Sequence, residues 1–153
     1  MVKNYYIPLL YIMNMLVNDA VSLNEYKKNH QSGVWLVWYY AEWCGHCQMM
    51  ADSWDTFTKL LKKSNLPINT AKIEDTMVSQ LGVSVNGFPT IELHKDGKLA
   101  EVYSDERSPK GFLKFCKKHA KTSKAKKTVS KKKKSTSLKK KKKRSSLKKK
   151  SRS

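Results

Sequence analysis

The segment "VWLVWYY" at residues 34–40 constrains the fold more than any other part of the sequence. Its seven residues are apolar or aromatic and carry no charge, which is typical of a strand buried on both faces. Beyond it, apolar side chains recur at intervals of three and four, as on one face of an amphipathic helix. That face consists of Cys47, Met50, Trp54, Phe57 and Leu61. A buried strand that leads into such a helix predicts a sheet covered by helices.

Strand and helix patterns of this kind alternate as far as residue 120. The other expected helices cover residues 23–28, 75–82 and 108–120. The other expected strands cover residues 68–74, 89–95 and 99–104. The last two strands are expected to form an antiparallel hairpin, because Asp96-Gly97 is a turn sequence. With a first strand before residue 17, this order predicts an α/β fold with a mixed central sheet flanked by helices.

Two interpretations fit the apolar residues 5–17, "YYIPLLYIMNMLV". Ala20-Val21-Ser22 follows them and resembles the cleavage site of a signal peptide. Pro8, Asn14 and the tyrosines favour a linker followed by a first strand, and we prefer this second interpretation. The segment is too short for a transmembrane helix.

Charge divides the chain near residue 120. Residues 121–153 contain 18 of the 32 Lys and Arg and no acid, whereas residues 1–120 contain the other 14 against 12 acids. The net charge of +20 therefore belongs almost entirely to the C-terminal part. We expect an N-terminal apolar segment (1–15), a globular domain (16–120) and a disordered Lys/Ser-rich tail (121–153), whose charge density prevents collapse.

Lysine runs of this density bind polyanions by counterion release, without reading sequence. The candidate polyanion-binding residues are Lys131, Lys132, Lys133, Lys134, Lys139, Lys140, Lys141, Lys142, Lys143 and Arg144. Nucleic acid is the favoured partner, ahead of an anionic membrane or an acidic protein, and the same runs fit a nuclear-import signal. The alternative is a tail that only keeps the protein soluble.

Three interpretations fit Cys44 and Cys47, which are separated by two residues at the start of the predicted helix. A structural zinc site needs four ligands, and His30, His94 and His119 are scattered along the chain. A static disulfide across so short a loop stabilises a fold little. We favour dithiol exchange, because a thiol at a helix N-terminus faces unpaired amides that stabilise a thiolate. Cys44 would attack, and Cys47 would resolve the mixed disulfide.

The residues around this pair have expected roles as well. Gly45 allows a tight approach to the sulfur, and His46 can place a positive charge beside the thiolate. Cys116 shares the inner face of the last helix with Phe112 and Phe115. It is expected to be a buried small hydrophobe, with a regulatory thiol as the alternative.

The sequence "AEWCGHC" (41–47) resembles the active site of the thioredoxin superfamily, and Cys-Gly-His-Cys is the form found in protein disulfide isomerase domains. The resemblance runs from about residue 16 to 120 and includes "AKIED" (71–75), "GFPT" (87–90) and "YSDERSPKGF" (103–112). It implies a thioredoxin fold and a thiol–disulfide oxidoreductase that acts on protein substrates. We also expect a monomer without a metal or other cofactor.

The resemblance also implies how the site binds substrate and how it is tuned. Pro89 would be a cis-proline that faces the cysteines, the Phe88 backbone would pair with an extended peptide, and Trp43 would flank the same groove. His46 implies a redox potential nearer that of protein disulfide isomerase (about −180 mV) than that of thioredoxin (about −270 mV). Such a potential favours donating or shuffling disulfides over reducing them.

This sequence departs from the family at two positions. Trp38 stands where the family has a buried carboxylate that accepts the proton of the resolving cysteine. Lys72 thereby loses its partner and is expected to extend outward or to lose its proton. Asp52 replaces a helix-kinking proline, which predicts a straighter helix. Arg107 matches an arginine that lowers the pKa of the resolving cysteine in the isomerases, with an ordinary surface arginine as the alternative.

A small redox domain with a basic tail resembles proteins of large DNA viruses, which favours the cytoplasm, the nucleus or a virion as its location. If residues 1–22 act as a signal peptide, the location would instead be the ER lumen or the outside of the cell. The alternative function is a nucleic-acid-binding or packaging protein whose thioredoxin-like domain is secondary or inactive.

Overall fold

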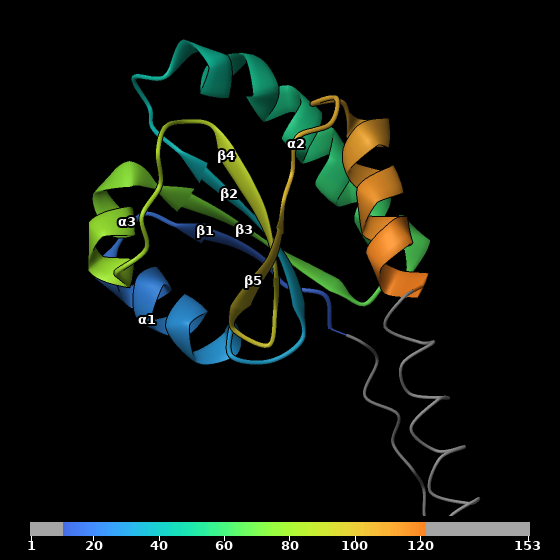
Figure 1. The fold of residues 1–153 in the computed structure, drawn as a ribbon, viewed down its shortest axis with the longest axis horizontal. Coiled ribbons are helices and arrows are strands. Elements are labelled where there is room, and N and C mark those ends of the chain that lie inside the picture. The colour runs from blue at the N-terminus through green and yellow to red at the C-terminus, as the bar shows by residue number, and fades with distance from the viewer. Residues whose placement is uncertain (1–10, 122–153) are drawn as a thin grey trace, which may run out of the picture. The chain divides into compact units, whose positions relative to one another are not determined.

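The computed structural model describes residues 11–121 of the chain. The predicted tail, with the candidate polyanion-binding residues 131–134 and 139–144, lies outside the described residues. The first compact unit ends at Lys117 and contains all the elements labelled in Figure 1. Its strands are β1 (Asn14–Val17), β2 (Val34–Tyr40), β3 (Ile68–Glu74), β4 (Thr90–Lys95) and β5 (Lys98–Val102). Its helices are α1 (Ala20–Asn29), α2 (Gly45–Ser64) and α3 (Asp75–Leu81). A further helix covers residues 109–121, which begin in this unit and end beyond it.

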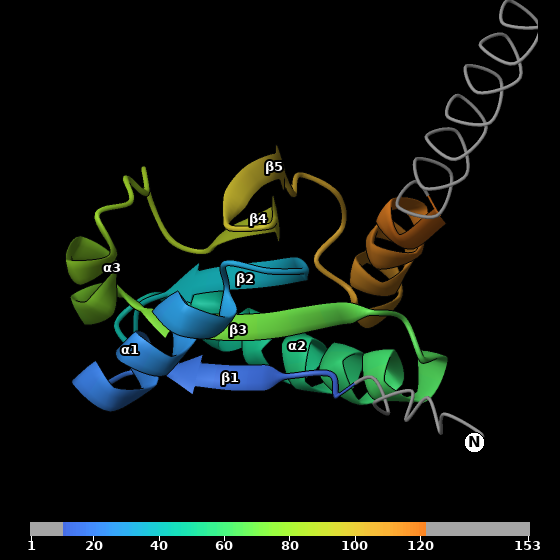
Figure 2. The ribbon, with the colours of Figure 1, turned by 90° about the horizontal axis from the view of Figure 1, so that it is seen from below.

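The five strands form one sheet in the order β1-β3-β2-β4-β5. β1 and β2 run parallel to β3, whereas β4 is antiparallel to both β2 and β5. Figure 2 shows β1 beside β3 at one edge and β5 beside β4 at the other. β2 is therefore the central strand, which explains why six of its seven residues are buried. The expected mixed α/β sheet is confirmed.

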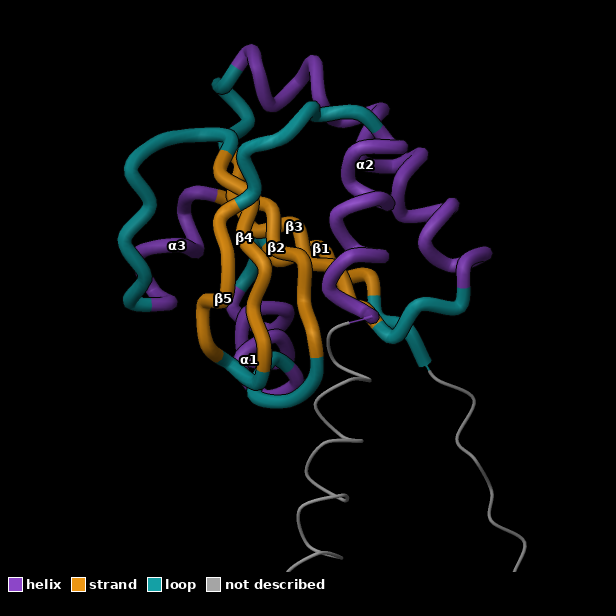
Figure 3. Tube along the Cα trace, turned by 45° about the vertical axis from the view of Figure 1, so that its right-hand side comes forward, coloured by secondary structure: helices purple, strands orange, loops and turns teal. Residues whose placement is uncertain are grey.

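The two faces of β2 are covered by different helices, as Figures 1 and 3 show. Trp35 and Tyr39 belong to a core that includes Tyr26 of α1, and we call this side the α1 face. Trp38 points to the opposite side and packs against Trp54 of α2, with 5.3 Å between the ring centroids, and we call this side the α2 face. The alternation follows from the two-residue period of a strand, which sends neighbouring side chains to opposite faces.

Local signals in the sequence account for the hairpin between β4 and β5. Asp96 and Gly97 have φ angles of 49° and 76°, so both lie in the left-handed region. Two-residue hairpin turns whose twist matches the flanking strands require positive φ at both positions. The predicted antiparallel hairpin is confirmed.

The first strand and the first helix of the described residues lie at the N-terminal end of the domain. Residues 14–17 form β1, as the preferred interpretation of the apolar segment predicts. α1 begins at Ala20, three residues earlier than expected, because Asp19 caps it: the Asp19 carboxylate accepts a hydrogen bond from the Ser22 N–H at 2.7 Å. Within residues 11–121, none of the helices combines the length and the apolar character needed to cross a membrane.

Candidate active site

Cys44 and Cys47 lie at the N-terminal end of α2, which follows the central strand. Cys44 is the N-cap residue, and its Sγ accepts a hydrogen bond from the Cys47 N–H at 3.2 Å. This sulfur takes the place of the side-chain oxygen that usually caps a helix. The amides and the positive end of the helix favour a negative charge on it. Both cysteines are free thiols, and Cys44 is the more exposed, at 6% against 2% for Cys47.

Cys47 differs from Cys44 in its electrostatic surroundings. Burial is the main cause that raises the pKa of the Cys47 thiol to about 11, and the hydrogen bond with the Cys44 side chain acts in the same direction. The Ala41 backbone and the positive charge of Arg107 oppose this rise in pKa. At neutral pH, Cys47 therefore keeps its proton. It must lose that proton before it can attack a mixed disulfide.

Three other residues with predicted roles, Gly45, His46 and Arg107, are exposed. Arg107 is a surface residue, yet its charge influences the pKa of Cys47, so the two interpretations of this arginine are compatible. A Cβ added at Gly45 would meet no atom within 4 Å. The folded chain itself does not require glycine at this position, and only a molecule that approaches Cys44 from outside could require it.

Asp52 and Cys116 lie in helices on the α2 side of the sheet. α2 continues through Asp52 without interruption, as expected for a helix that lacks the family's proline. Cys116 is fully buried, and burial raises the pKa of its thiol to about 12. A thiol of this kind is unreactive, so Cys116 is the expected small hydrophobe rather than a regulatory group.

The loop before β4 lies next to the cysteine loop. The peptide bond between Phe88 and Pro89 is cis, as the resemblance implied. Phe88 packs edge-on against Trp43, with 6.0 Å between the ring centroids. Trp43 is 73% exposed, and its Nε1–H donates a hydrogen bond to the Asp75 carboxylate at 3.0 Å. The residue next to Cys44 in the sequence is thus an exposed aromatic side chain held in one orientation.

Trp38 and Lys72 are directly opposite each other in the parallel pair β2–β3. The Lys72 ammonium lies 4.8 Å from the centroid of the Trp38 ring and 4.4 Å from that of the Tyr40 ring. Both distances are in the range of cation–π interactions, which stabilise a lysine that has no carboxylate partner. Lys72 is half-buried, so its outward extension stays a prediction, and the two ring contacts are an addition to it. Tyr40, two residues after Trp38 on the same face of β2, was the signal that sequence reasoning missed.

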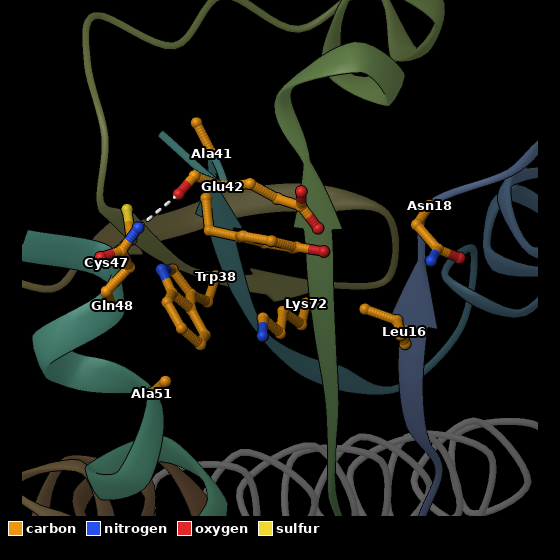
Figure 4. Close-up of a pocket in the computed structure, with 10 residues that line it drawn as sticks. Leu16, Asn18, Trp38, Ala41, Glu42, Cys47, Gln48, Ala51 and Lys72 are labelled. Carbon is orange, nitrogen blue, oxygen red and sulfur yellow. Dashed lines mark hydrogen bonds between the residues drawn. The ribbon is translucent and has the colours of Figure 1, made fainter. Parts of the chain in front are cut away.

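A pocket of about 470 Å³ lies beside these residues on the α2 face (Figure 4). Sequence reasoning did not anticipate it. Its lining includes Trp38, Tyr40, Glu42, Cys47, Gln48 and Lys72. Trp38 is 1% exposed, and its Nε1–H is buried without a hydrogen-bond partner. The pocket is therefore lined both by Cys47, the resolving cysteine, and by Trp38, the position at which the sequence departs from the family.

The similarity to known proteins agrees with this geometry. A family model described as Thioredoxin matches residues 17–118. The chain belongs to the thioredoxin family. This thioredoxin-family chain is 35% identical over 96 residues to mouse "Protein disulfide-isomerase TMX3", which covers 61% of the chain and 21% of that protein. It is also 35% identical over 86 residues to "Protein disulfide-isomerase" of Saccharomyces cerevisiae, which covers 55% of the chain and 16% of that protein.

Solved structures show the same fold. The first thioredoxin domain of mouse Protein disulfide-isomerase A4 is 28% identical, with a TM-score of 0.53, and the match covers 69% of this chain and 74% of that one. The first two thioredoxin domains of Naumovozyma dairenensis Eps1p give a TM-score of 0.56 at 22% identity, covering 63% of this chain and 38% of that one. The described domain thus has a thioredoxin fold, but the chain spans only about a fifth of the length of the TMX3 relatives.

Proposed function

We propose that this protein is a thiol–disulfide oxidoreductase of the protein disulfide isomerase type, which exchanges disulfides with protein substrates through Cys44 and Cys47. One observation carries the proposal: Cys44 Sγ caps α2 and Cys44 is the more exposed residue of the pair, while Cys47 is more deeply buried and keeps its proton. A dithiol exchanger needs this asymmetry between an attacking and a resolving thiol. The relatives named protein disulfide isomerase support the same reaction.

The reducing direction begins when the Cys44 thiolate attacks one sulfur of a substrate disulfide. A bond forms between Cys44 and the substrate as the substrate S–S bond breaks, and the leaving sulfur takes up a proton. Cys47 then loses its proton and attacks Cys44 Sγ, which forms the Cys44–Cys47 disulfide and releases the second substrate sulfur. In the oxidising direction, a substrate thiolate attacks this disulfide and the same steps run in reverse.

The proposed substrate is an extended polypeptide segment that lies beside Trp43, Phe88 and Pro89. The Trp43 indole is exposed but fixed by Asp75 and Phe88, so it presents an apolar surface without losing side-chain freedom on binding. An extended segment that pairs with the Phe88 backbone would bind by main-chain hydrogen bonds, which tolerate many sequences. This mode suits an enzyme that acts on different proteins.

The proposed direction of exchange depends on His46, which is exposed on the first turn of α2. A positive charge on this imidazole stabilises the reduced thiolate form of the site and so raises the redox potential. A site with a raised potential donates or shuffles disulfides more readily than it reduces them. The potential proposed here is therefore nearer that of protein disulfide isomerase than that of thioredoxin.

Trapping of mixed disulfides tests the assignment of the two thiols. Cys47→Ser should accumulate covalent complexes with substrate proteins, because the resolving thiol is gone, whereas Cys44→Ser should accumulate almost none. Non-reducing electrophoresis with scrambled ribonuclease as substrate measures both. Cys116→Ala is the matched control, since it removes the third thiol from a buried position and should exchange like the wild type. Equal trapping by Cys44→Ser and Cys47→Ser would contradict the assignment.

The charge of residues 121–153 supports a second, independent proposal: the tail tethers the redox domain to a polyanion such as nucleic acid. This would place disulfide exchange beside nucleic acid, in the cytoplasm, the nucleus or a virion. Deleting the tail should abolish DNA binding at low salt and leave exchange with a neutral peptide unchanged. Binding by the full chain should weaken steeply with salt and depend little on base sequence. Salt-insensitive or sequence-selective binding would contradict a tail-borne interaction.

A further inference from the structure

The segment between β5 and the last helix carries Arg107, which is exposed but whose positive charge lowers the pKa of Cys47. Figures 1 and 3 both show this segment beside α2, the helix that contains Cys47. Within residues 11–121, no salt bridge includes Arg107. The interaction between two charges weakens with distance and with screening by solvent. The effect of this arginine therefore depends on where the backbone places it.

The residue before Arg107 is held by its backbone carbonyl. The Glu106 carbonyl oxygen accepts hydrogen bonds from the Tyr103 hydroxyl and from the Ser108 N–H, the latter at 2.8 Å. The Ser108 hydroxyl accepts a hydrogen bond from the Gly111 N–H at 3.1 Å, so that Ser108 also caps the last helix. The peptide unit that leads into Arg107 is thus tied both to the end of the sheet and to the start of a helix.

Tyr103 is a rigid donor for this carbonyl. It is 8% exposed, and its ring packs against Phe112 and Phe115, with 5.1 Å and 5.0 Å between the ring centroids. Burial, and then the negative charges of Asp105 and Glu106, raise the pKa of the Tyr103 hydroxyl to about 12. The hydroxyl therefore keeps its proton, and remains a donor, through the neutral and mildly alkaline range.

Gly111 makes room for the same carbonyl. A Cβ at this position would lie 2.8 Å from the Tyr103 hydroxyl oxygen and closer still to the Glu106 carbonyl oxygen, within a range that real Cβ atoms do not enter. The φ angle of Gly111 is not positive, so the position requires space and not an unusual backbone conformation. A glycine inside a helix is less stable than an alanine, and the contact with the carbonyl explains why one stands here.

We propose that Tyr103 and Gly111 are positioning residues for Arg107. Together with Ser108 they fix the Glu106 carbonyl, and we call these three residues the carbonyl clamp. The clamp holds the arginine at a distance from which its charge assists the resolving thiol. This inference rests on the proposed function, because the resolving step occurs only in a dithiol exchanger.

The carbonyl clamp acts on one state of the resolving step. Cys47 loses its proton to water, its thiolate attacks Cys44 Sγ, and the Cys44–Cys47 bond forms as the bond between Cys44 and the substrate breaks. The substrate sulfur leaves as a thiolate and takes a proton from water. The charge of Arg107 favours the thiolate of Cys47 over the thiol, and no atom of the clamp gains or loses a bond. Loss of the clamp should therefore raise the pKa of Cys47 and slow release at neutral pH.

Tyr103→Phe tests the carbonyl clamp, because it removes the hydroxyl and keeps the ring that packs against the last helix. The readout is the pKa of Cys47, measured from the pH dependence of its Cβ chemical shift in reduced, full-length protein labelled at cysteine; Cys47→Ser assigns the signal. Tyr103→Phe should raise this pKa and lower the thiolate fraction at neutral pH about threefold. Tyr26→Phe is the matched control, since it removes a buried hydroxyl that has no partner, and it should leave the pKa of Cys47 unchanged.

Arg107→Met tests whether the carbonyl clamp acts through the arginine. By itself, this variant should raise the pKa of Cys47 and slow the release of a mixed disulfide at least as much as Tyr103→Phe does. Tyr103→Phe added to Arg107→Met should then have no further effect. Glu42 and Lys72, the charged residues that line the pocket with Cys47, are the same in all variants. An equal effect of Tyr103→Phe with and without Arg107 would point to a loosened fold and would overturn the inference.

Gly111→Ala is a second, independent way to displace the Glu106 carbonyl. It should reproduce the rise in the pKa of Cys47, whereas Lys110→Ala, at an exposed position one residue earlier, should not. Wild-type pKa and release rate in both Tyr103→Phe and Gly111→Ala would overturn the inference. If Cys47→Ser still traps mixed disulfides in that case, the proposed function holds and only the role of the clamp is wrong. If Cys44→Ser and Cys47→Ser trap equally, the proposed function fails as well.

Discussion

Polar groups are buried on both faces of the sheet at β2, and the two faces differ in how these groups are hydrogen-bonded. On the α1 face, His30 Nε2 and His94 Nδ1 lie 2.9 Å apart, and His94 Nε2 donates to the Glu92 carboxylate at 2.8 Å. Tyr39 is hydrogen-bonded to the same carboxylate, which helps to raise its pKa after the larger effect of burial. On the α2 face, the Trp38 Nε1–H has no partner.

The difference shows which face the chain completes by itself. A connected set of buried hydrogen bonds makes a core rigid and specific, and the α1 face has such a set, although the Tyr26 hydroxyl on this face is also unpaired. The α2 face leaves a donor and an ammonium beside the reactive cysteines. We infer that the α1 face serves stability and that the α2 face serves exchange. The predictions that follow test this division.

The largest effect is expected from exchanging the two buried tryptophans of β2, one per face, for glutamate. Trp38→Glu and Trp35→Glu should each destabilise the fold by about 3 to 5 kcal/mol, because each removes a fully buried ring. Only Trp38→Glu should also speed the release of mixed disulfides, since its carboxylate would lie beside Cys47 and opposite Lys72. Urea unfolding and single-turnover release, corrected for the folded fraction, measure the two quantities.

Trp35→Glu is the matched control for this prediction. Trp35 points to the α1 face, where its Nε1–H already donates to the Ser32 carbonyl at 3.0 Å. If both variants speed release equally, the gain comes from a loosened fold rather than from a proton acceptor. If neither does, Trp38 is a packing substitution without catalytic consequence.

The contrast between the faces also explains how much the sequence could predict. The uncharged run 34–40, the apolar face of α2 and the Asp96-Gly97 turn are local periodic signals, and the structure confirms all three. The contact between His30 and His94 joins residues 64 positions apart. It depends on the β2–β4 register, which places His94 opposite Trp35, so the two histidines looked scattered in the sequence. Periodicity carries no such information.

The candidate site divides in the same way. The positions of Cys44, Cys47 and the cis Phe88–Pro89 bond followed from the motif and the resemblance. The cation–π contacts of Lys72 and the pocket did not, because they depend on side-chain rotamers on β1, β2, β3 and α2 at once. Trp38 replaces the carboxylate that pairs with this lysine in the family, so the family pattern no longer predicts where the Lys72 side chain lies.

The second prediction concerns acid stability, which the α1 face should control. Burial, and then the neighbouring His94, lower the pKa of His30 to about 4, from an ordinary value of 6.5. The unfolded chain therefore takes up this proton first as the pH falls. Stability should be unaffected by this group above pH 6.5 and should decline between about pH 6.5 and 4, by roughly 3 kcal/mol in total. Urea unfolding across this pH range measures the slope.

His30→Gln should flatten that slope, because an amide cannot be protonated in this range but can still donate a hydrogen bond to His94 Nδ1. His46→Gln, which replaces an exposed histidine on α2, is the matched control and should keep the wild-type slope. The same slope in wild type and His30→Gln would show that the histidine pair does not set acid stability.

The smallest expected effect is a change of redox potential, and it should come from the α2 side alone. His46→Pro removes the charge that favours the thiolate beside Cys44, so the oxidised form gains relative to the reduced form and the potential falls. A shift of tens of millivolts is expected, where 30 mV corresponds to about 1.4 kcal/mol for a two-electron couple. Equilibration with glutathione measures it.

His30→Gln sharpens the last comparison, because it changes a histidine on the other face of β2. The His30 imidazole is bonded to His94 on the α1 face, so its loss should alter acid stability and leave the glutathione equilibrium unchanged. His46→Pro should shift the glutathione equilibrium and leave acid stability unchanged, because the His46 side chain is exposed. If His30→Gln shifts the potential as much as His46→Pro does, the two faces of β2 are coupled. The inference that the α1 face serves stability and the α2 face serves exchange would then be wrong.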